Sequence, residues 1–125
     1  MPAKVIDASA LAAVLFAERD ATEVANRIRG HSLVSPTLLP FEIASVCLKK
    51  MRQHPARKAS LLAAYNLLAR MEIAEAEVNG SEIVELAEEE GLTVYDAAYL
   101  WLARKLGAEL VTLDKTLARA ALRTR

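Results

Sequence analysis

Four acidic residues carry the chemistry that this sequence indicates. Asp7, Glu42, Asp96 and Asp114 lie far apart in the chain, yet each comes where an apolar strand or loop passes into a predicted helix. In an open α/β sheet such junctions lie along one edge, above the carboxyl ends of the strands, so the four carboxylates are predicted to be neighbours. Their oxygens are hard ligands that suit Mg²⁺ or Mn²⁺, and there is no Cys/His cluster that would favour zinc. The pattern indicates a divalent metal site.

Each acid also has a purely structural interpretation. Asp7 and Asp114 precede helices, where an Asp side chain accepts hydrogen bonds from free amides and complements the positive helix end. Asp96 follows Thr93 by three residues, which is an arrangement that satisfies a first helical turn, and Glu42 suits the start of its helix. Taken one at a time, the acids fit this capping role better than a catalytic one.

Taken together, the acids favour a shared metal site, because two of them lie among apolar residues. Glu42 lies between Phe41 and Ile43, and Asp96 lies in the run 95–99, whose other members are Tyr and Ala. Both segments are predicted to be buried. A lone buried carboxylate is costly, whereas several that converge on a cation are not, because the ion supplies the missing charge.

Strands that alternate with helical segments position these acids. Short β-branched runs predict strands, and cap residues, Gly and Pro mark the helix ends, including a capping box from Asp20 to Glu23. The predicted strands are Lys4–Ile6, Ser32–Ser35, Glu72–Glu75 and Glu109–Leu113; the predicted helices are Ala10–Phe16, Asp20–Gly30, Phe41–Gln53, Ala56–Arg70, Ser81–Glu90, Tyr95–Leu106 and Asp114–Leu122. The alternation predicts an α/β fold with a small parallel sheet, and the third and fourth helices form a helical hairpin.

Composition predicts one soluble domain over residues 1–125. A chain of 125 residues with 54% hydrophobic residues is long enough for one core. Lys plus Arg and Asp plus Glu each number 16, so no global charge attracts nucleic acid or membranes. The single Cys47, the absence of a signal-peptide pattern and the absence of an apolar run of about 20 residues predict a cytoplasmic protein without a membrane span.

The acids stand in four motifs that resemble those of a known family. Residues 5–10 (VIDASA), 40–44 (PFEIA), 92–99 (LTVYDAAY) and 110–114 (LVTLD) are similar, in order and register, to the motifs of the PIN domain. More narrowly, they resemble those of VapC-type toxins of prokaryotic toxin–antitoxin pairs. The resemblance extends from Lys4 to the last helix, and all four acidic positions match.

The resemblance implies a fold, an activity and partners. The implied fold is a three-layer α/β/α sandwich, and the implied activity is metal-dependent hydrolysis of RNA by water, which leaves 5′-phosphate and 3′-hydroxyl ends. Asp7, Glu42, Asp96 and Asp114 would hold Mg²⁺ or Mn²⁺, with hydroxyl groups from the accessory residues nearby. These accessory residues are Ser9 and Thr112. Such toxins are dimers inhibited by an antitoxin, so a homodimer and a cognate VapB-like antitoxin are expected.

Basic residues near the predicted hairpin tip have two interpretations. They are Lys49, Lys50, Arg52, Arg57 and Lys58. They either neutralise RNA phosphates beside the cut or form a solvated face with favourable charge at a helix end, and the second interpretation fits slightly better.

Other polar and aromatic residues are given structural roles. His31 and His54 are predicted to be exposed turn residues and not general bases, and Glu88–Glu90 to be an exposed polar face. Tyr99 and Trp101 are predicted to pack in the core or an interface and not to stack on bases.

The helical hairpin is more apolar than covering a small sheet requires. Its apolar residues are Leu38, Leu39, Phe41, Val46, Leu48, Leu61, Leu62, Tyr65, Leu67 and Leu68. Part of this set is predicted to form a partner surface, and the alternative is that all of it packs inside the domain.

Three other functional classes fit parts of the pattern. A phosphoacceptor signalling module needs adjacent acids after its first strand, but Ala8 follows Asp7. A phosphatase with an Asp nucleophile would need further motifs and a longer chain. A non-catalytic protein whose acids hold a structural ion remains the main alternative to the nuclease.

Overall fold

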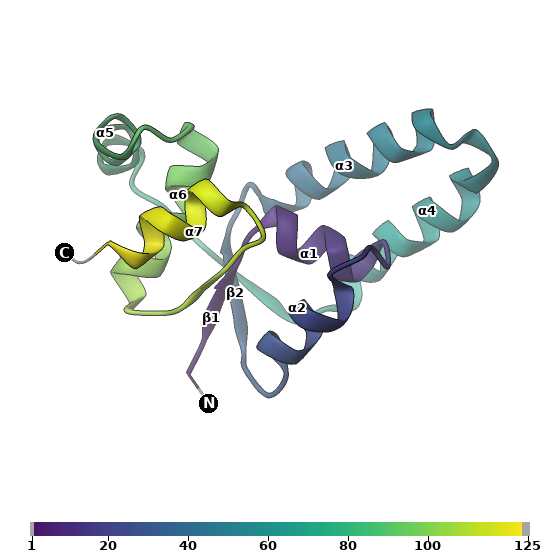
Figure 1. Cartoon of the computed structure of the whole chain (residues 1–125), viewed down its shortest axis with the longest axis horizontal. Helices are drawn as coiled ribbons and strands as arrows, with labels where there is room; N and C mark the ends of the chain where they lie inside the picture. The colour runs from purple at the N-terminus through teal and green to yellow at the C-terminus, as the bar shows by residue number, and fades with distance from the viewer. Residues whose placement is uncertain (1, 124–125) are drawn as a thin grey trace.

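The computed structural model describes residues 2–123, and a parallel four-stranded sheet lies at its centre (Figure 1). The strands are β1 (Lys4–Ile6), β2 (Leu33–Pro36), β3 (Ile73–Ala76) and β4 (Leu110–Val111). Their spatial order is β3-β2-β1-β4. Val5 is paired with Val34 of β2 on one side and with Leu110 of β4 on the other, so β1 is a central strand.

Helical segments connect the strands. The α-helices are α1 (Ala8–Leu15), α2 (Ala21–Ile28), α3 (Leu39–Gln53), α4 (Lys58–Asn66), α5 (Gly80–Glu90), α6 (Val94–Leu106) and α7 (Lys115–Leu122), and the 3₁₀ helices are η1 (Pro55–Arg57) and η2 (Leu67–Arg70). None of these helices, within residues 2–123, has both the length and the apolar character needed to cross a membrane.

The connections sort the helices into two layers around the sheet, as predicted. The first three strands move steadily toward one edge, and the chain then returns past β1 to form β4 on the other side. Because parallel crossovers are right-handed, this reversal puts α5 and α6 on the face opposite α1 and α2. Helix α6 accordingly packs on β1, β2 and β4, while α3 and α4 form a hairpin that projects to one side of the sandwich (Figure 1).

The core lies between the central strands and the two helical layers. Val5, Ile6 and Val111 are fully buried, as expected for a parallel sheet covered on both faces. Leu100 of α6 and Leu117 of α7 are also buried in this core. The central strand β1 is therefore held rigidly, together with the residue that follows it.

Several predicted boundaries differ by one to three residues in the structure, and three of these differences have a clear physical cause. Helix α3 begins two residues before Phe41, because Pro40 fits a first turn, where its missing N–H group is not needed. The predicted helix 56–70 is α4 with a 3₁₀ turn at each end. The predicted strand 109–113 pairs only at Leu110 and Val111, because its partner β1 ends at Ile6.

One predicted cap is wrong and two predicted stops are confirmed. The side chain of Asp20 makes no capping hydrogen bond, and its backbone (φ −97°, ψ 14°) is not the extended conformation that an N-cap adopts. Helices α5 and α6 end at Gly91 and Gly107, which have φ values of +70° and +62°. These left-handed positions favour glycine because it has no Cβ.

Candidate active site

The four acids follow the topology of the sheet. Asp7 comes directly after β1, and Asp114 comes three residues after the end of its neighbour β4. The strand order reverses between β1 and β4, which is where open α/β sheets place their ligand crevice. Helices α1, α3 and α7 begin near one another at this edge (Figure 1). The carboxyl edge of the sheet therefore holds the starts of the helices that follow Asp7 and Asp114 and of the helix that carries Glu42.

Asp7 is the most enclosed of the four acids and is held by several donors. It is 4% exposed, and its Oδ1 accepts hydrogen bonds from the Ala10 amide at 3.0 Å and from Ser9 Oγ at 2.8 Å. Its Oδ2 accepts a hydrogen bond from Thr112 Oγ1 at 2.5 Å. Asp7 thus caps α1, as the structural interpretation predicted. Each carboxylate oxygen has two lone pairs, and Oδ2 accepts only the one hydrogen bond from Thr112, so one lone pair of Asp7 stays available to a ligand.

Two hydroxyl groups join Asp7 to the segment that carries Asp114. Thr112 Oγ1, which donates to Asp7, accepts a hydrogen bond from the Asp114 amide at 3.0 Å. Ser9 Oγ accepts one from the Leu113 amide at 2.9 Å. Ser9 and Thr112 therefore fix the β4–α7 connection against the start of α1, which supplies a physical reason for hydroxyl residues at both positions.

Glu42 is positioned by a tyrosine that the sequence pattern assigned only to packing. Tyr99 is 1% exposed, and its hydroxyl donates a hydrogen bond to Glu42 Oε1 at 2.6 Å. The bond ties the first turn of α3 to α6. Tyr99 lies three residues after Asp96, so both residues face the same side of a helix. That spacing was the signal in the sequence that could have identified it.

Asp96 and Asp114 lie in or beside the first turns of their helices. Asp114 caps α7 by accepting a hydrogen bond from the Leu117 amide at 3.0 Å. The amide of Asp96 donates to Thr93 Oγ1 at 3.1 Å, so Thr93 caps α6 and the Asp96 side chain takes no part in that bond. The capping predictions at both helices are confirmed.

Electrostatic coupling indicates that the four carboxylates share one region. Burial raises the pKa of Asp7, Glu42 and Asp96 above its ordinary value. The charge of Asp114 further raises the pKa of Asp7 and Asp96, and the charges of Asp7 and Asp96 further raise the pKa of Glu42. Asp7 and Asp96 thus each interact with all three other acids. Hydrogen bonds from Thr112 and Tyr99 oppose the effect at Asp7 and Glu42 by stabilising their ionised forms.

This donor set fits a hard divalent cation. It consists of carboxylate oxygens, the ligands that Mg²⁺ and Mn²⁺ prefer, and a cation would relieve the mutual repulsion that raises the pKa values. Among residues 2–123, no three Asp, Glu, His or Cys side chains converge closely enough to enclose an ion by themselves. Mg²⁺ usually keeps several waters and takes only one or two carboxylates directly, so a closed protein cage is not required.

The comparisons with known proteins agree with this arrangement. The sequence profile described as PIN domain matches residues 4–122, which is nearly the whole chain. The chain belongs to the PIN domain family. It is 37% identical over 123 residues to Ribonuclease VapC3 of Pyrobaculum aerophilum, an alignment that covers 91% of each protein.

Solved structures of similar proteins have the same fold. The crystal structure of PAE2754 from Pyrobaculum aerophilum matches with a TM-score of 0.76 and 25% identity, over 98% of this chain and 89% of that one. VapC20 of Mycobacterium tuberculosis, described as a toxin that cleaves the sarcin–ricin loop, matches with a TM-score of 0.65 over 96% of this chain and 98% of that one. Its 14% identity supports the fold alone. The predicted three-layer PIN fold is thereby confirmed.

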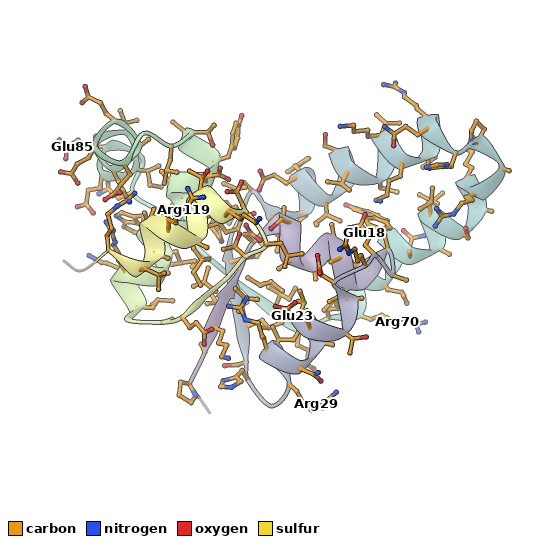
Figure 2. All side chains as sticks on the ribbon, in the orientation of Figure 1. Glu18, Glu23, Arg29, Arg70, Glu85 and Arg119 are labelled. Atoms are coloured by element: carbon orange, nitrogen blue, oxygen red, sulfur yellow. The ribbon has the colours of Figure 1, made fainter. Side chains whose placement is uncertain are left out.

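The basic residues of the hairpin tip lie away from the candidate site. In Figure 1 the turn between α3 and α4 projects far from the starts of α1 and α7. Lys50 forms an ion pair with Glu18 and lies 5.8 Å from the ring centroid of Phe16, so it helps to hold α3 against the end of α1. Figure 2 shows charged side chains of both signs over the elements, including Glu18, Glu85 on α5 and Arg119 on α7.

Two predictions about other polar residues need correction. His31 is half-buried and not exposed, with Nδ1 at 3.0 Å from the Pro2 carbonyl oxygen at the amino-terminal edge of the sheet; His54 is exposed, as predicted. Glu88 and Glu89 are exposed, as predicted, but the Glu90 side chain is 8% exposed and accepts hydrogen bonds from Arg104 and Arg123. These bonds lower the pKa of Glu90.

The aromatic and apolar predictions have mixed outcomes. Trp101 packs against α5 and donates from Nε1 to Glu82 Oε1 at 2.8 Å, as a packing role requires. The predicted burial around two acids is half right: Ile43 and Ala97, which follow Glu42 and Asp96, are buried, but Phe41 is 82% exposed and Tyr95 is 61% exposed. Each lies on the solvent side of a helical turn whose other side packs inward.

The hairpin divides into a packed side and an exposed side. Leu39 and Leu61 are in the core, with Leu38, Val46, Tyr65 and Leu68 packed against it; Phe41, Leu48, Leu62 and Leu67 are exposed. Internal packing thus explains only part of the apolar set.

Proposed function

We propose that this protein is a metal-dependent endoribonuclease of the VapC toxin type, which hydrolyses RNA phosphodiester bonds. The observation that carries the proposal is the electrostatic coupling of four acids from four distant segments, in which Asp7 and Asp96 interact with all the others. Mutual repulsion of carboxylates destabilises the folded protein, and a bound cation would offset it. The 37% identity to Ribonuclease VapC3 supports the same activity.

Asp7, Glu42, Asp96 and Asp114 are the proposed ligands of Mg²⁺ or Mn²⁺. The ion supplies Lewis acidity toward a phosphate oxygen and lowers the pKa of a water. Other residues of the chain hold these carboxylates in place. Tyr99 fixes the direction of the Glu42 carboxylate through a bond of 2.6 Å, while Thr112 and Ser9 hold Asp7. The products expected from the family resemblance carry 5′-phosphate and 3′-hydroxyl ends.

The biological setting follows from the same family. We propose that the whole chain is one nuclease domain that acts in the cytoplasm as a homodimer and is inhibited by a cognate VapB-like antitoxin. The exposed apolar residues on the hairpin, such as Leu62 and Leu67, are available to such partners. Four basic residues of the hairpin tip are proposed to contact RNA outside the acidic centre. They are Lys49, Arg52, Arg57 and Lys58.

Cleavage of cellular RNA tests the proposal directly. Purified protein is incubated with total RNA and Mg²⁺ or Mn²⁺, and new ends are mapped by sequencing. Discrete cuts with 5′-phosphates are expected, and both chelator and Asp96→Asn should abolish them. Asp20→Asn is the matched control, because Asp20 makes no side-chain cap hydrogen bond and lies outside the proposed ligand set. Metal binding without any cleavage would favour the non-catalytic alternative.

A further inference from the structure

The two edge strands of the sheet differ in the residues that they present. Strand β3 forms one edge, carries the exposed Glu75 and is followed by the exposed Glu77. Charged side chains on an edge strand discourage pairing with a further strand. Strand β4 forms the other edge, and its two residues, Leu110 and Val111, are apolar and buried. The β4 edge therefore has no charged residue within the strand to protect it.

The backbone of Leu110 faces this open edge. The amide of Val5 donates to the Glu109 carbonyl at 2.9 Å, and the amide of Asp7 donates to the Val111 carbonyl at 3.1 Å. In a parallel ladder, alternate residues direct their N–H and C=O groups toward the same partner strand, so those of Leu110 point away from β1. Among residues 2–123 the Leu110 N–H group has no hydrogen-bond partner, although the residue is only 7% exposed. Such unpaired amides are rare in native proteins.

A cleft of about 410 Å³ lies along the same edge. Helices α6 and α7 pack on β4 from one side and α2 from the other, and residues of all three helices line the cleft. The wall that α7 contributes consists of Ala118, Ala121 and Leu122. The short alanine side chains leave space above the strand. The volume lies within the range of about 300–1,000 Å³ that is usual for ligand clefts.

The lining of the cleft has an excess of positive charge. Its charged residues are Arg27, Arg104 and Glu109. Nη2 of Arg27 lies 3.1 Å from Glu109 Oε2 and 3.5 Å from the Leu110 carbonyl oxygen, and Lys4 also forms an ion pair with Glu109. Two cations thus share one carboxylate beside the open edge. A ligand with an acidic group there would be electrostatically complementary.

An extended peptide fits this edge better than a second copy of the chain does. Backbone in the extended conformation presents a donor and an acceptor with the spacing that a strand edge requires. A second copy would offer the same edge, which is recessed between its own helices, so two such edges cannot approach to hydrogen-bonding distance. A flexible segment can enter the cleft.

We propose that the open edge of β4 binds an extended segment of another protein, which adds one more strand to the sheet. The apolar side chains of the segment pack on Ala118 and Ala121, and an acidic residue of the segment lies beside Arg27. Thr112 also lines the cleft, so the segment contacts the connection that holds Asp7 through the Thr112 hydroxyl. The proposal does not depend on the proposed nuclease activity.

A titration followed by NMR spectroscopy tests strand addition at Leu110. The probe is a synthetic peptide of about eight residues in which Val and Thr alternate between terminal Glu residues. When it is added to the isotope-labelled full chain, the Leu110 amide resonance should move downfield, and its hydrogen exchange should slow by about 10-fold or more. An unchanged Leu110 amide at about 1 mM peptide would overturn the proposal.

A matched pair of variants tests the cleft. Ala118→Trp fills the space beside α7 and should weaken peptide binding by about 10-fold or more. Thr116→Trp is the control, because it adds the same ring at an exposed position two residues away, on the other side of α7, and should leave binding unchanged. Equal affinities of the two variants for the peptide would rule out this cleft.

Altered peptides test the chemistry with the unaltered protein, so their result does not depend on whether a variant folds. Methylation of alternate peptide nitrogens removes backbone donors and should weaken binding by about 10-fold. Replacement of the terminal Glu residues by Lys should weaken it by about 2- to 5-fold. A methylated peptide that binds as tightly as the original would exclude strand addition.

The free protein distinguishes the other possible occupants of the edge. Slow exchange of the Leu110 amide at low protein concentration would mean that the chain covers its own edge. Exchange that slows with increasing protein concentration, and that Ala118→Trp makes fast again, would mean that two copies meet there. Either result would overturn the peptide proposal, and RNA cleavage by the unaltered protein is measured separately.

Discussion

Thr112→Val should destabilise the protein far more than its small chemical change implies. The substitution preserves the side-chain shape and removes one oxygen atom. That oxygen donates a hydrogen bond to Asp7 Oδ2 at 2.5 Å and accepts one from the Asp114 amide at 3.0 Å. Because Thr112 is 6% exposed, water cannot readily replace either partner.

The expected magnitude follows from the two partners left behind. A hydrogen bond to a charged group contributes about 1.5–3 kcal/mol, and an unpaired buried amide costs about 1–3 kcal/mol. The Asp114 amide is only partly buried, so the lower end applies to it. The sum is about 3 kcal/mol, which is a large share of the roughly 5–15 kcal/mol that stabilises a typical domain. The corresponding fall in Tm is about 10 °C.

Urea denaturation of the metal-free protein measures this effect. Thr116→Val is the matched control, because Thr116 is exposed on α7 and its substitution should change the unfolding free energy by less than about 0.5 kcal/mol. A loss of under about 1 kcal/mol for Thr112→Val, with an unchanged denaturant slope, would refute the hydroxyl link between Asp7 and Asp114. The pKa of Asp7 should also rise further in this variant, because the Thr112 hydrogen bond lowers it.

Three other perturbations test the core, the acids and the thiol. Leu117→Ala removes a fully buried side chain beneath α7 and should cost about 2–5 kcal/mol in thermal or urea unfolding; a cost below about 1 kcal/mol would mean that the core is misassigned. Burial and the charges of Asp114 and Asp7 raise the pKa of Asp96, so between about pH 4 and that raised value the folded chain binds more protons than the unfolded chain. The unfolding free energy of the metal-free protein should therefore fall as the pH rises through this range. The unfolding free energy of Asp96→Asn should fall less, so it should increase relative to that of the unaltered protein from about pH 4 to 7; a constant difference between the two proteins would contradict the predicted sign. Burial raises the pKa of the Cys47 thiol, which is 4% exposed, so an aromatic disulfide reagent should react with it only after denaturation, and rapid reaction in the native protein would exclude this packing.

Local signals in the sequence predicted most of the elements and missed several of their ends. Gly91 and Gly107 stop their helices because a left-handed residue is needed there, which is a property of the chain itself. Asp20 does not cap its helix because its backbone is not extended, and a turn with Ala17 at φ 51° precedes it in the chain. Strand β4 is short because a distant strand ends at Ile6. Errors of this kind arise from partners that are remote in sequence.

The acids of the candidate site were predicted, but their surroundings were not. Asp7 and Asp114 were identifiable because they follow strands in a pattern that alternates with helices. The hydrogen bond from Tyr99 to Glu42 joins residues 57 positions apart, and no local rule predicts it. The exposure of Phe41 and Tyr95 was also predicted wrongly, because an apolar sequence does not specify which side of a helix faces solvent.

The sequence by itself determined the α/β class, the helix caps at Asp7, Thr93 and Asp114, the stops at Gly91 and Gly107, and the four acidic positions, because each depends on neighbours within a few residues. Tertiary structure alone decided the strand order β3-β2-β1-β4, and with it the meeting of Asp7 and Asp114 at the edge where that order reverses. It also decided the raised pKa values and the hydroxyl link through Thr112. These properties depend on burial and on charges brought together by folding, and such distances do not exist in the unfolded chain.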